Sequence, residues 1–148
     1  MQHPIGRSRL GVSIALSAIS GFLCLAFCAF YLWALLEFGL PTESLRSLAI
    51  LSRLLAFPFF LVSVGGLRLA CMLLWGDCIL VWALDIASSS GPFTLSPFSS
   101  RGSTIQIAAA CLLTIAYSLV AKMGDGVDST GRKPSIRSMI RIYDRNSN

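Results

Sequence analysis

Hydrophobic residues run almost without interruption through most of this chain, in four blocks separated by short polar or glycine-containing breaks. The blocks cover residues 10–36, 45–64, 67–87 and 104–121. A helix needs about 20 apolar residues to cross the hydrocarbon core of a bilayer, because each residue adds about 1.5 Å. The pattern therefore predicts an all-α, polytopic integral membrane protein with four transmembrane helices.

The breaks between the blocks carry residues that end helices. Leu-Pro-Thr-Glu at 40–43 precedes the second block, Gly65-Gly66 ends it, and residues 88–103 are rich in serine, proline and glycine, which predicts a loop. The second block also contains two arginines and Pro58. An alternative topology therefore has three spans, with the second block lying at the interface or re-entering. Its length and the distribution of basic residues favour four spans.

Basic residues indicate the orientation of the helices. The chain is 55% hydrophobic and only 13% charged, with a net charge of +5, whereas a soluble domain has about 25% charged residues. Arg7 and Arg9 precede the first block, Arg68 follows the second, and most other basic residues follow the fourth. Basic residues gather on the cytoplasmic side of membrane proteins. Both termini are therefore expected on the cytoplasmic, matrix or stromal side of a bacterial or organellar inner membrane.

Three regions follow from this pattern: an N-terminal basic segment (1–9), a transmembrane domain (10–121) and a basic C-terminal tail (122–148). Because the basic residues flank apolar blocks, they are expected to contact anionic lipid. No nucleic-acid partner is expected.

Charged residues inside the second and third blocks occur at matching distances from the glycine turn. Arg53 lies 13 residues before Gly66 and Asp77 lies 11 after it, while Arg46 and Asp85 lie 20 before and 19 after. The first two differ in depth by only about 3 Å on antiparallel helices. We therefore predict intramembrane ion pairs between Arg53 and Asp77 and between Arg46 and Asp85. An isolated charge at the centre of a membrane costs roughly 2.5–3.5 kcal/mol.

Two interpretations of this charged hairpin remain open. The ion pairs either fix the register of the two helices, or Asp77 titrates as part of a proton or ion path. The structural interpretation is favoured because Cys78, Trp75 and apolar residues are the only neighbours of Asp77 along the chain. Pro58 also removes an amide from the second block, which frees the Leu54 carbonyl, and Arg53 is expected to donate to it.

Small residues in the first block form a candidate packing face. Small side chains at four-residue spacing let two helices approach closely in lipid. The residues of this predicted face are Gly11, Ala15, Ser17 and Gly21.

The tail has the pattern of a short amphipathic helix after Pro134. Ile136, Met139, Ile140 and Tyr143 follow a helical period, and Arg137, Arg141 and Arg145 form a basic stripe. Such a helix is expected to lie on a membrane surface containing anionic lipid, or on an acidic partner. A solvated, frayed tail is the alternative. The residues expected to contact the surface are Ile136, Arg137, Ile140, Arg141, Tyr143 and Arg145.

The sequence contains no pattern typical of a catalytic site. It has no phosphate-binding glycine loop, no Ser/His/Asp set and no metal-ligand cluster. Its five cysteines all lie in apolar blocks without a CxxC motif, which indicates packing. We therefore expect no enzyme, no cofactor and no metal.

The function expected from these features is that of a non-catalytic accessory, assembly or scaffold subunit of a larger membrane complex. One alternative is a small oligomeric transporter or channel component that uses the Arg53/Asp77 pair. A second is a membrane anchor or regulator whose tail binds lipid or a partner.

Overall fold

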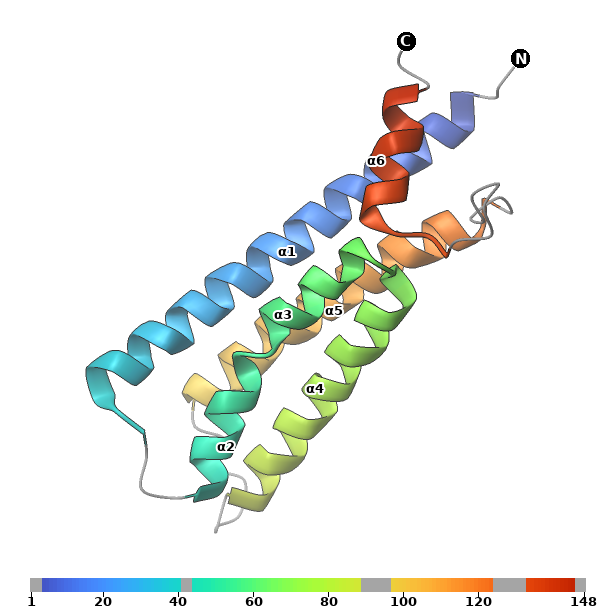
Figure 1. Ribbon diagram of the computed structural model, residues 1–148. Coiled ribbons are helices and arrows are strands. Elements are labelled where there is room, and N and C mark those ends of the chain that lie inside the picture. Colours follow the sequence, from blue (N-terminus) through green and yellow to red (C-terminus); the bar gives the residue numbers. More distant parts are fainter. Residues whose placement is uncertain (1–3, 41–43, 89–96, 124–132, 146–148) are drawn as a thin grey trace.

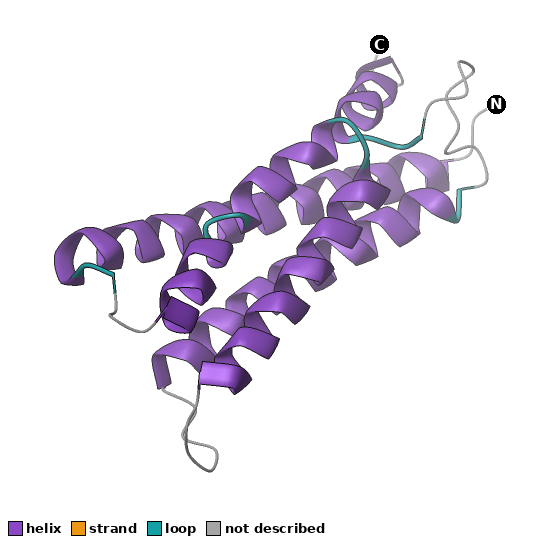
Figure 2. Ribbon diagram, turned by 60° about the horizontal axis from the view of Figure 1, so that its bottom comes forward, coloured by secondary structure: helices purple, strands orange, loops and turns teal. Residues whose placement is uncertain are grey.

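The computed structural model describes residues 4–40, 44–88, 97–123 and 133–145 (Figure 1). This part of the chain consists of helices and short turns, without strands (Figure 2). Its elements are α1 (Pro4–Phe38), α2 (Ser44–Arg53), α3 (Ala56–Leu61), the 3₁₀ helix η1 (Val62–Val64), α4 (Leu67–Ser88), α5 (Pro97–Ala121) and α6 (Ile136–Arg145).

Four helical stretches are long and apolar enough to span a membrane, as the sequence pattern predicted. The second of them is not one helix but the succession of α2, α3 and η1. The four stretches are Arg7–Phe38, Ser47–Val64, Leu67–Ala87 and Ser103–Ala121.

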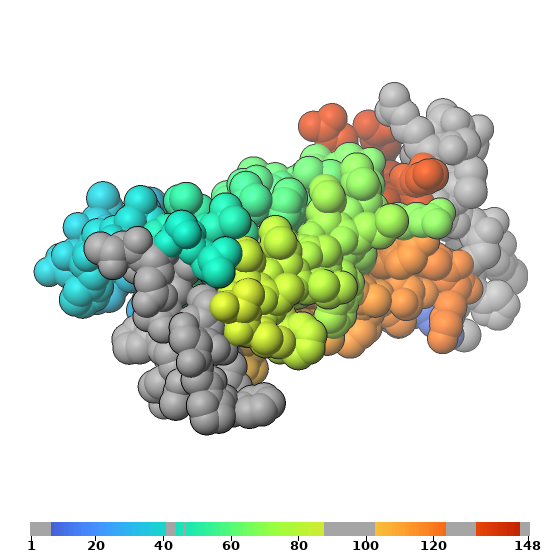
Figure 3. Space-filling model, turned by 90° about the horizontal axis from the view of Figure 1, so that it is seen from below, coloured from blue at the N-terminus to red at the C-terminus, as the bar shows by residue number. Residues whose placement is uncertain are grey.

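The four stretches form a bundle in which each contacts two main neighbours. α1 packs along α5, α5 packs on α4, and α4 packs on α2 and α3. α3 also contacts α1, so the bundle closes on itself, whereas α2 diverges from α1 (Figure 1). Seen from below, α2, α3 and α4 form one continuous face with α5 beside α4 (Figure 3). The start of α1 and the whole of α6 lie at the same end of the bundle (Figure 1).

Two helices begin earlier than the hydrophobic pattern predicted. α1 starts at Pro4 and so includes Arg7 and Arg9, and α5 starts at Pro97, within the segment predicted to be a loop. Proline suits the first turn of a helix, because its backbone nitrogen has no hydrogen to leave unbonded and its φ angle is already helical. Hydrophobicity marks the apolar part of a helix and not its polar ends.

Small residues allow α1 and α5 to pack closely. The hydroxyls of Ser13 and Ser20 on α1 each donate a 2.8 Å hydrogen bond to a backbone carbonyl of α5, those of Ala116 and Ala109. Interhelical bonds of this kind, between small side chains and backbone, are typical of helix contacts in lipid.

The predicted small-residue face is confirmed only in part. Ser17 and Gly21 are buried, and Gly11 faces Tyr143, but Ala15 is exposed. The buried face of α1 follows Ser13, Ser17 and Ser20, and Ala15 lies two residues from Ser13. Two residues correspond to about 200° of rotation around a helix, so Ala15 points outward.

A break between α2 and α3 divides the second stretch at Leu54 and Leu55. Pro58 has no amide hydrogen, so the Leu54 carbonyl loses its partner in the helix. The backbone forms a tight turn instead, in which the amide of Leu55 donates to Ser52 at 3.0 Å. The thiol of Cys28 on α1 lies 3.7 Å from the Leu54 carbonyl oxygen. Cys28, and not Arg53 as predicted, therefore supplies the donor to the freed carbonyl.

α6 packs against the bundle, so the alternative of a frayed tail is wrong for residues 136–145. Met139 is only 1% exposed and its sulfur lies 3.4 Å from the Ser13 hydroxyl. The Pro134 carbonyl accepts a 3.0 Å hydrogen bond from the amide of Leu67, the first residue of α4. The Ser135 hydroxyl accepts from the Ser138 amide and caps the helix.

The predicted surface residues of α6 divide into two groups. Ile136 packs against the core, and Tyr143 lies on Gly11 with the Arg7 guanidinium 5.6 Å from its ring centre. These two side chains therefore contact the chain itself, because α1 extends far enough to meet them. The predicted surface residues that are exposed, and available to lipid or a partner, are Arg137, Ile140, Arg141, Arg145 and, in part, Tyr143, which is 36% exposed.

A buried polar cluster as the candidate functional site

An ion pair links the end of α2 to the last turns of α4. Nη2 of Arg53 lies 2.5 Å from Oδ2 of Asp85, and the two side chains are only 5% and 14% exposed. The Arg53 guanidinium carbon also lies 5.0 Å from the ring centre of Tyr31 on α1, a favourable cation–π distance. Three helices thus share one buried positive charge.

The predicted pairing of Arg53 with Asp77 is wrong, since Arg53 pairs with Asp85. The prediction compared backbone depths and did not consider side-chain direction. Each Cα–Cβ bond in a helix tilts toward the N-terminus of that helix. On antiparallel helices, level side chains such as Arg53 and Asp77 therefore point apart along the axis. Asp85 lies farther down α4 and tilts back toward Arg53, whose long side chain covers the remaining distance.

The second predicted ion pair joined Arg46 and Asp85. Arg46 lies in α2, but its side chain falls outside the described residues.

Asp77 lies in the interior of the bundle with an amide as its bonded partner. It is 4% exposed and Gln106, on α5, is 2% exposed. Nε2 of Gln106 donates to Oδ2 of Asp77 at 2.5 Å. The other Asp77 oxygen, Oδ1, and the Gln106 carbonyl oxygen, Oε1, are buried and have no hydrogen-bond partner among the described residues.

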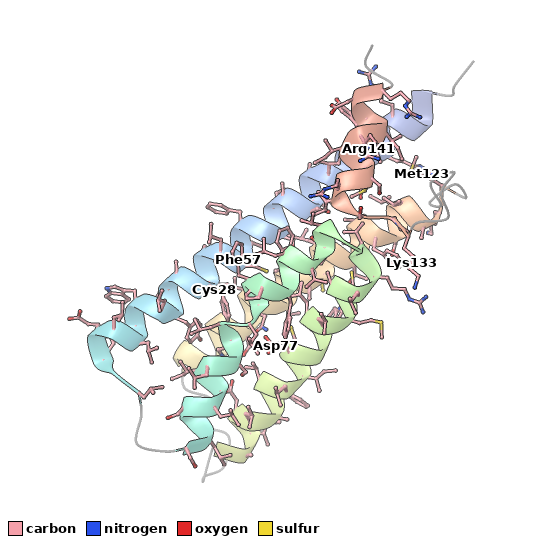
Figure 4. All side chains as sticks on the ribbon, in the orientation of Figure 1. Cys28, Phe57, Asp77, Met123, Lys133 and Arg141 are labelled. Carbon is pink, nitrogen blue, oxygen red and sulfur yellow. The ribbon has the colours of Figure 1, made fainter. Side chains whose placement is uncertain are left out.

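Three cysteine thiols lie within electrostatic range of the Asp77 carboxylate: Cys24 and Cys28 from α1 and Cys78 from α4. In Figure 4, Cys28 lies across from Phe57 at the start of α3, and Asp77 projects into the middle of the bundle near this level. The cluster therefore lies beside the break between α2 and α3.

Gln106 and Tyr31 were not found by reasoning from the sequence. A usable signal existed for Gln106, because it is the only side-chain amide in the fourth apolar block. Tyr31 gave no comparable signal, because an aromatic residue near the end of an apolar block is common in membrane helices.

The cluster does not have the form of a metal centre. In the described part of the chain, no group of three or more His, Cys, Asp or Glu side chains is arranged to hold a metal ion. What these residues can do is stabilise the packing of four helices through buried polar contacts and hold a charge away from water.

Comparisons with other proteins give no relative. No protein-family model matches the chain, and no curated protein and no solved structure matches it. The function is therefore argued from the geometry alone.

Proposed function

We propose that this protein is a non-catalytic accessory, assembly or scaffold subunit of a larger membrane complex. It lies in a bacterial or organellar inner membrane, with both termini on the cytoplasmic, matrix or stromal side. The proposal is supported by the polar side chains in the interior, which bond to one another and to the backbone of neighbouring helices. Arg53 is paired with Asp85, and two serines of α1 donate hydrogen bonds to backbone carbonyls of α5. The Cys28 thiol donates to the Leu54 carbonyl, which has no helical partner at the break between α2 and α3. These contacts maintain the shape of the bundle.

The single observation that carries the proposal is the outward face of α1. Four alanines and one large ring lie there in a helical stripe, and all are exposed: Ala15, Ala18, Phe22, Ala26 and Ala29. Phe22 is 69% exposed. Small residues on an outward face let a second helix approach closely in lipid, and a protruding ring can fill a recess in that helix. We assign this face, named here the α1 alanine face, to contact with a partner subunit.

Replacing Ala18 with leucine is expected to release the partner. The added side chain would hold the partner helix away from the α1 alanine face. We expect at least a tenfold loss of co-purified partner, which corresponds to about 1.4 kcal/mol. The measurement is native mass spectrometry of the tagged full chain after extraction in mild detergent.

Ala108→Leu is the matched control for this experiment, because Ala108 is also exposed but lies on α5. It should leave the complex intact. A native chain that is monomeric, or a complex that survives Ala18→Leu unchanged, would contradict the proposal.

A second candidate function is that of a small oligomeric transporter or channel component. It was expected from a pair between Arg53 and Asp77, and that pair is absent. The observation that still favours it is the buried Asp77 carboxylate, whose Oδ1 has no hydrogen-bond partner. The same native mass measurement distinguishes the candidates, because this function predicts a homo-oligomer and the first predicts a hetero-complex.

The basic face of α6 is expected to bind anionic lipid. Arg137, Arg141 and Arg145 are exposed on a helix that lies at the end of the bundle. Each basic residue near an anionic surface contributes about 1 kcal/mol. Replacing all three with glutamine should therefore reduce retention of phosphatidylglycerol by more than tenfold in native mass spectra. The matched triple lysine variant keeps the charge and should retain the lipid. Equal retention by the glutamine variant would exclude this contact.

A further inference from the structure

We infer that Asp77 and Gln106 form a buried proton-binding site, in which Asp77 takes up and releases one proton inside the bundle. This inference deepens the second candidate function by naming its ligand. It does not depend on the accessory function, since a subunit of a larger complex can contain such a site as well.

The first argument is the hydrogen bonding of the pair. Asp77 and Gln106 are joined by one bond, from Nε2 to Oδ2. Each also has an oxygen, Oδ1 of Asp77 and Oε1 of Gln106, that is buried without a hydrogen-bond partner among the described residues. A buried polar atom without a hydrogen bond is destabilising, so this cost occurs twice within one bonded pair.

A single proton on Oδ1 would give both of these oxygens a hydrogen bond. It would turn Oδ1 from an acceptor into a donor, and the oxygen available to accept is Oε1 of the amide that already bonds Asp77. A carboxylic acid and a primary amide can join through two bonds, one N–H···O and one O–H···O, since each group offers both a donor and an acceptor. The charged carboxylate can form only the first of these with the amide.

The second argument is the charge of the interior. The described charged side chains around the site are Arg53 on α2, which acts on Asp77 at electrostatic range, and Asp85 and Asp77 on α4. The thiols of Cys24 and Cys28 on α1 and of Cys78 on α4 lie within electrostatic range of Asp77, and α5 adds the neutral Gln106. Arg53 is already bonded to Asp85. One proton therefore neutralises a charge that is expensive to keep in an apolar interior.

The surroundings favour a proton over a metal cation. Hard cations such as sodium or calcium take several oxygen ligands. Asp77 and Gln106 offer two unbonded oxygens, and the other described groups at electrostatic range of Asp77 are soft thiols and the cationic Arg53. The backbone carbonyls of Arg53 and Leu54, at the break between α2 and α3, are contacted by the Cys28 thiol.

The test uses dicyclohexylcarbodiimide, an apolar reagent. The O–H of a protonated carboxylic acid adds across one of its C=N bonds, so that the carboxyl oxygen bonds to the central carbon and the proton moves to nitrogen. The full chain in detergent is treated over a series of pH values, and the modified residue is identified by peptide mass spectrometry. We expect Asp77 to be modified, with a yield that falls at least tenfold as the pH rises. Asp85 is an internal control, because it lies in the same helix but is bonded to Arg53, and it should stay unmodified.

Two further measurements make the result decisive. Excess sodium at constant pH should leave the yield at Asp77 unchanged, and protection by sodium would overturn the inference in favour of a metal-cation site. Infrared spectra should show a carboxylic-acid C=O band at low pH that is absent in Asp77→Asn and shifted in Gln106→Leu. A native chain with neither the adduct nor the band would exclude a proton on Asp77. That outcome would leave the co-purification test of the accessory function unaffected.

Discussion

Replacing Arg53 with methionine is expected to destabilise the bundle by about 3–5 kcal/mol, the usual cost of removing one partner from a buried ion pair. Arg53 bonds to Asp85 and lies over the Tyr31 ring. Methionine fills much of the same volume but leaves the Asp85 carboxylate in the interior without the guanidinium. The free energy of unfolding of the purified full chain, measured by denaturant titration in mixed micelles, checks this value.

A double variant separates the ion pair from simple packing. Arg53→Met combined with Asp85→Leu removes both charges and should recover most of the lost stability, because an apolar pair of similar volume often replaces a buried ion pair at little cost. Asp77→Asn should cost much less than Arg53→Met, since Asp77 is bonded to Gln106. A larger loss for Asp77→Asn than for Arg53→Met would restore the pairing that the sequence predicted.

Gly21→Val is expected to separate α1 from α3 and to cost about 1–3 kcal/mol, the usual range for overpacking. A Cβ atom at Gly21 would lie 2.5 Å from the Phe60 ring atoms Cε1 and Cζ. Since the ring is rigid and packs against the core, either Phe60 or the helix must move. Thermal unfolding of the full chain in detergent provides the measurement.

Gly11 provides the matched control for Gly21. It lies on the same helix, and a Cβ there would meet Tyr143 at 3.8 Å, an ordinary contact. Gly11→Val should therefore cost less than Gly21→Val. Phe60→Ala in the Gly21→Val background should restore part of the stability, because it removes the atoms that clash. If Phe60→Ala only adds to the loss, the close approach of α1 and α3 is not the cause.

For the charged hairpin, the sequence predicted where a buried ionic contact lies but not which residues form it. The turn at Gly65-Gly66 and the charged positions in both blocks could be found from the sequence, and they are where the buried ionic contact lies. The partner of Arg53 could not be found from residue spacing. It depends on the direction in which each side chain leaves its helix and on the break at Leu54 and Leu55, and only the three-dimensional packing combines these.

For the C-terminal helix α6, too, the sequence predicted the element but not its contacts. Its amphipathic pattern was correctly predicted, and its basic face is exposed. Its apolar face was expected to meet lipid or a partner, whereas Met139 and Ile136 pack against the chain itself. Periodicity shows that a face must be covered but not what covers it.

By itself the sequence determined that the described chain is helical, that four stretches can cross a membrane, and that arginine and aspartate lie inside two of them. These properties depend on the local order of apolar and polar residues, which must suit the bilayer over a fixed length. Only the tertiary structure decided that Arg53 meets Asp85, that Gln106 meets Asp77 and that α6 rests on α1. Such contacts join residues far apart in the chain, and they depend on helix rotation, helix depth and side-chain direction, which no local pattern specifies.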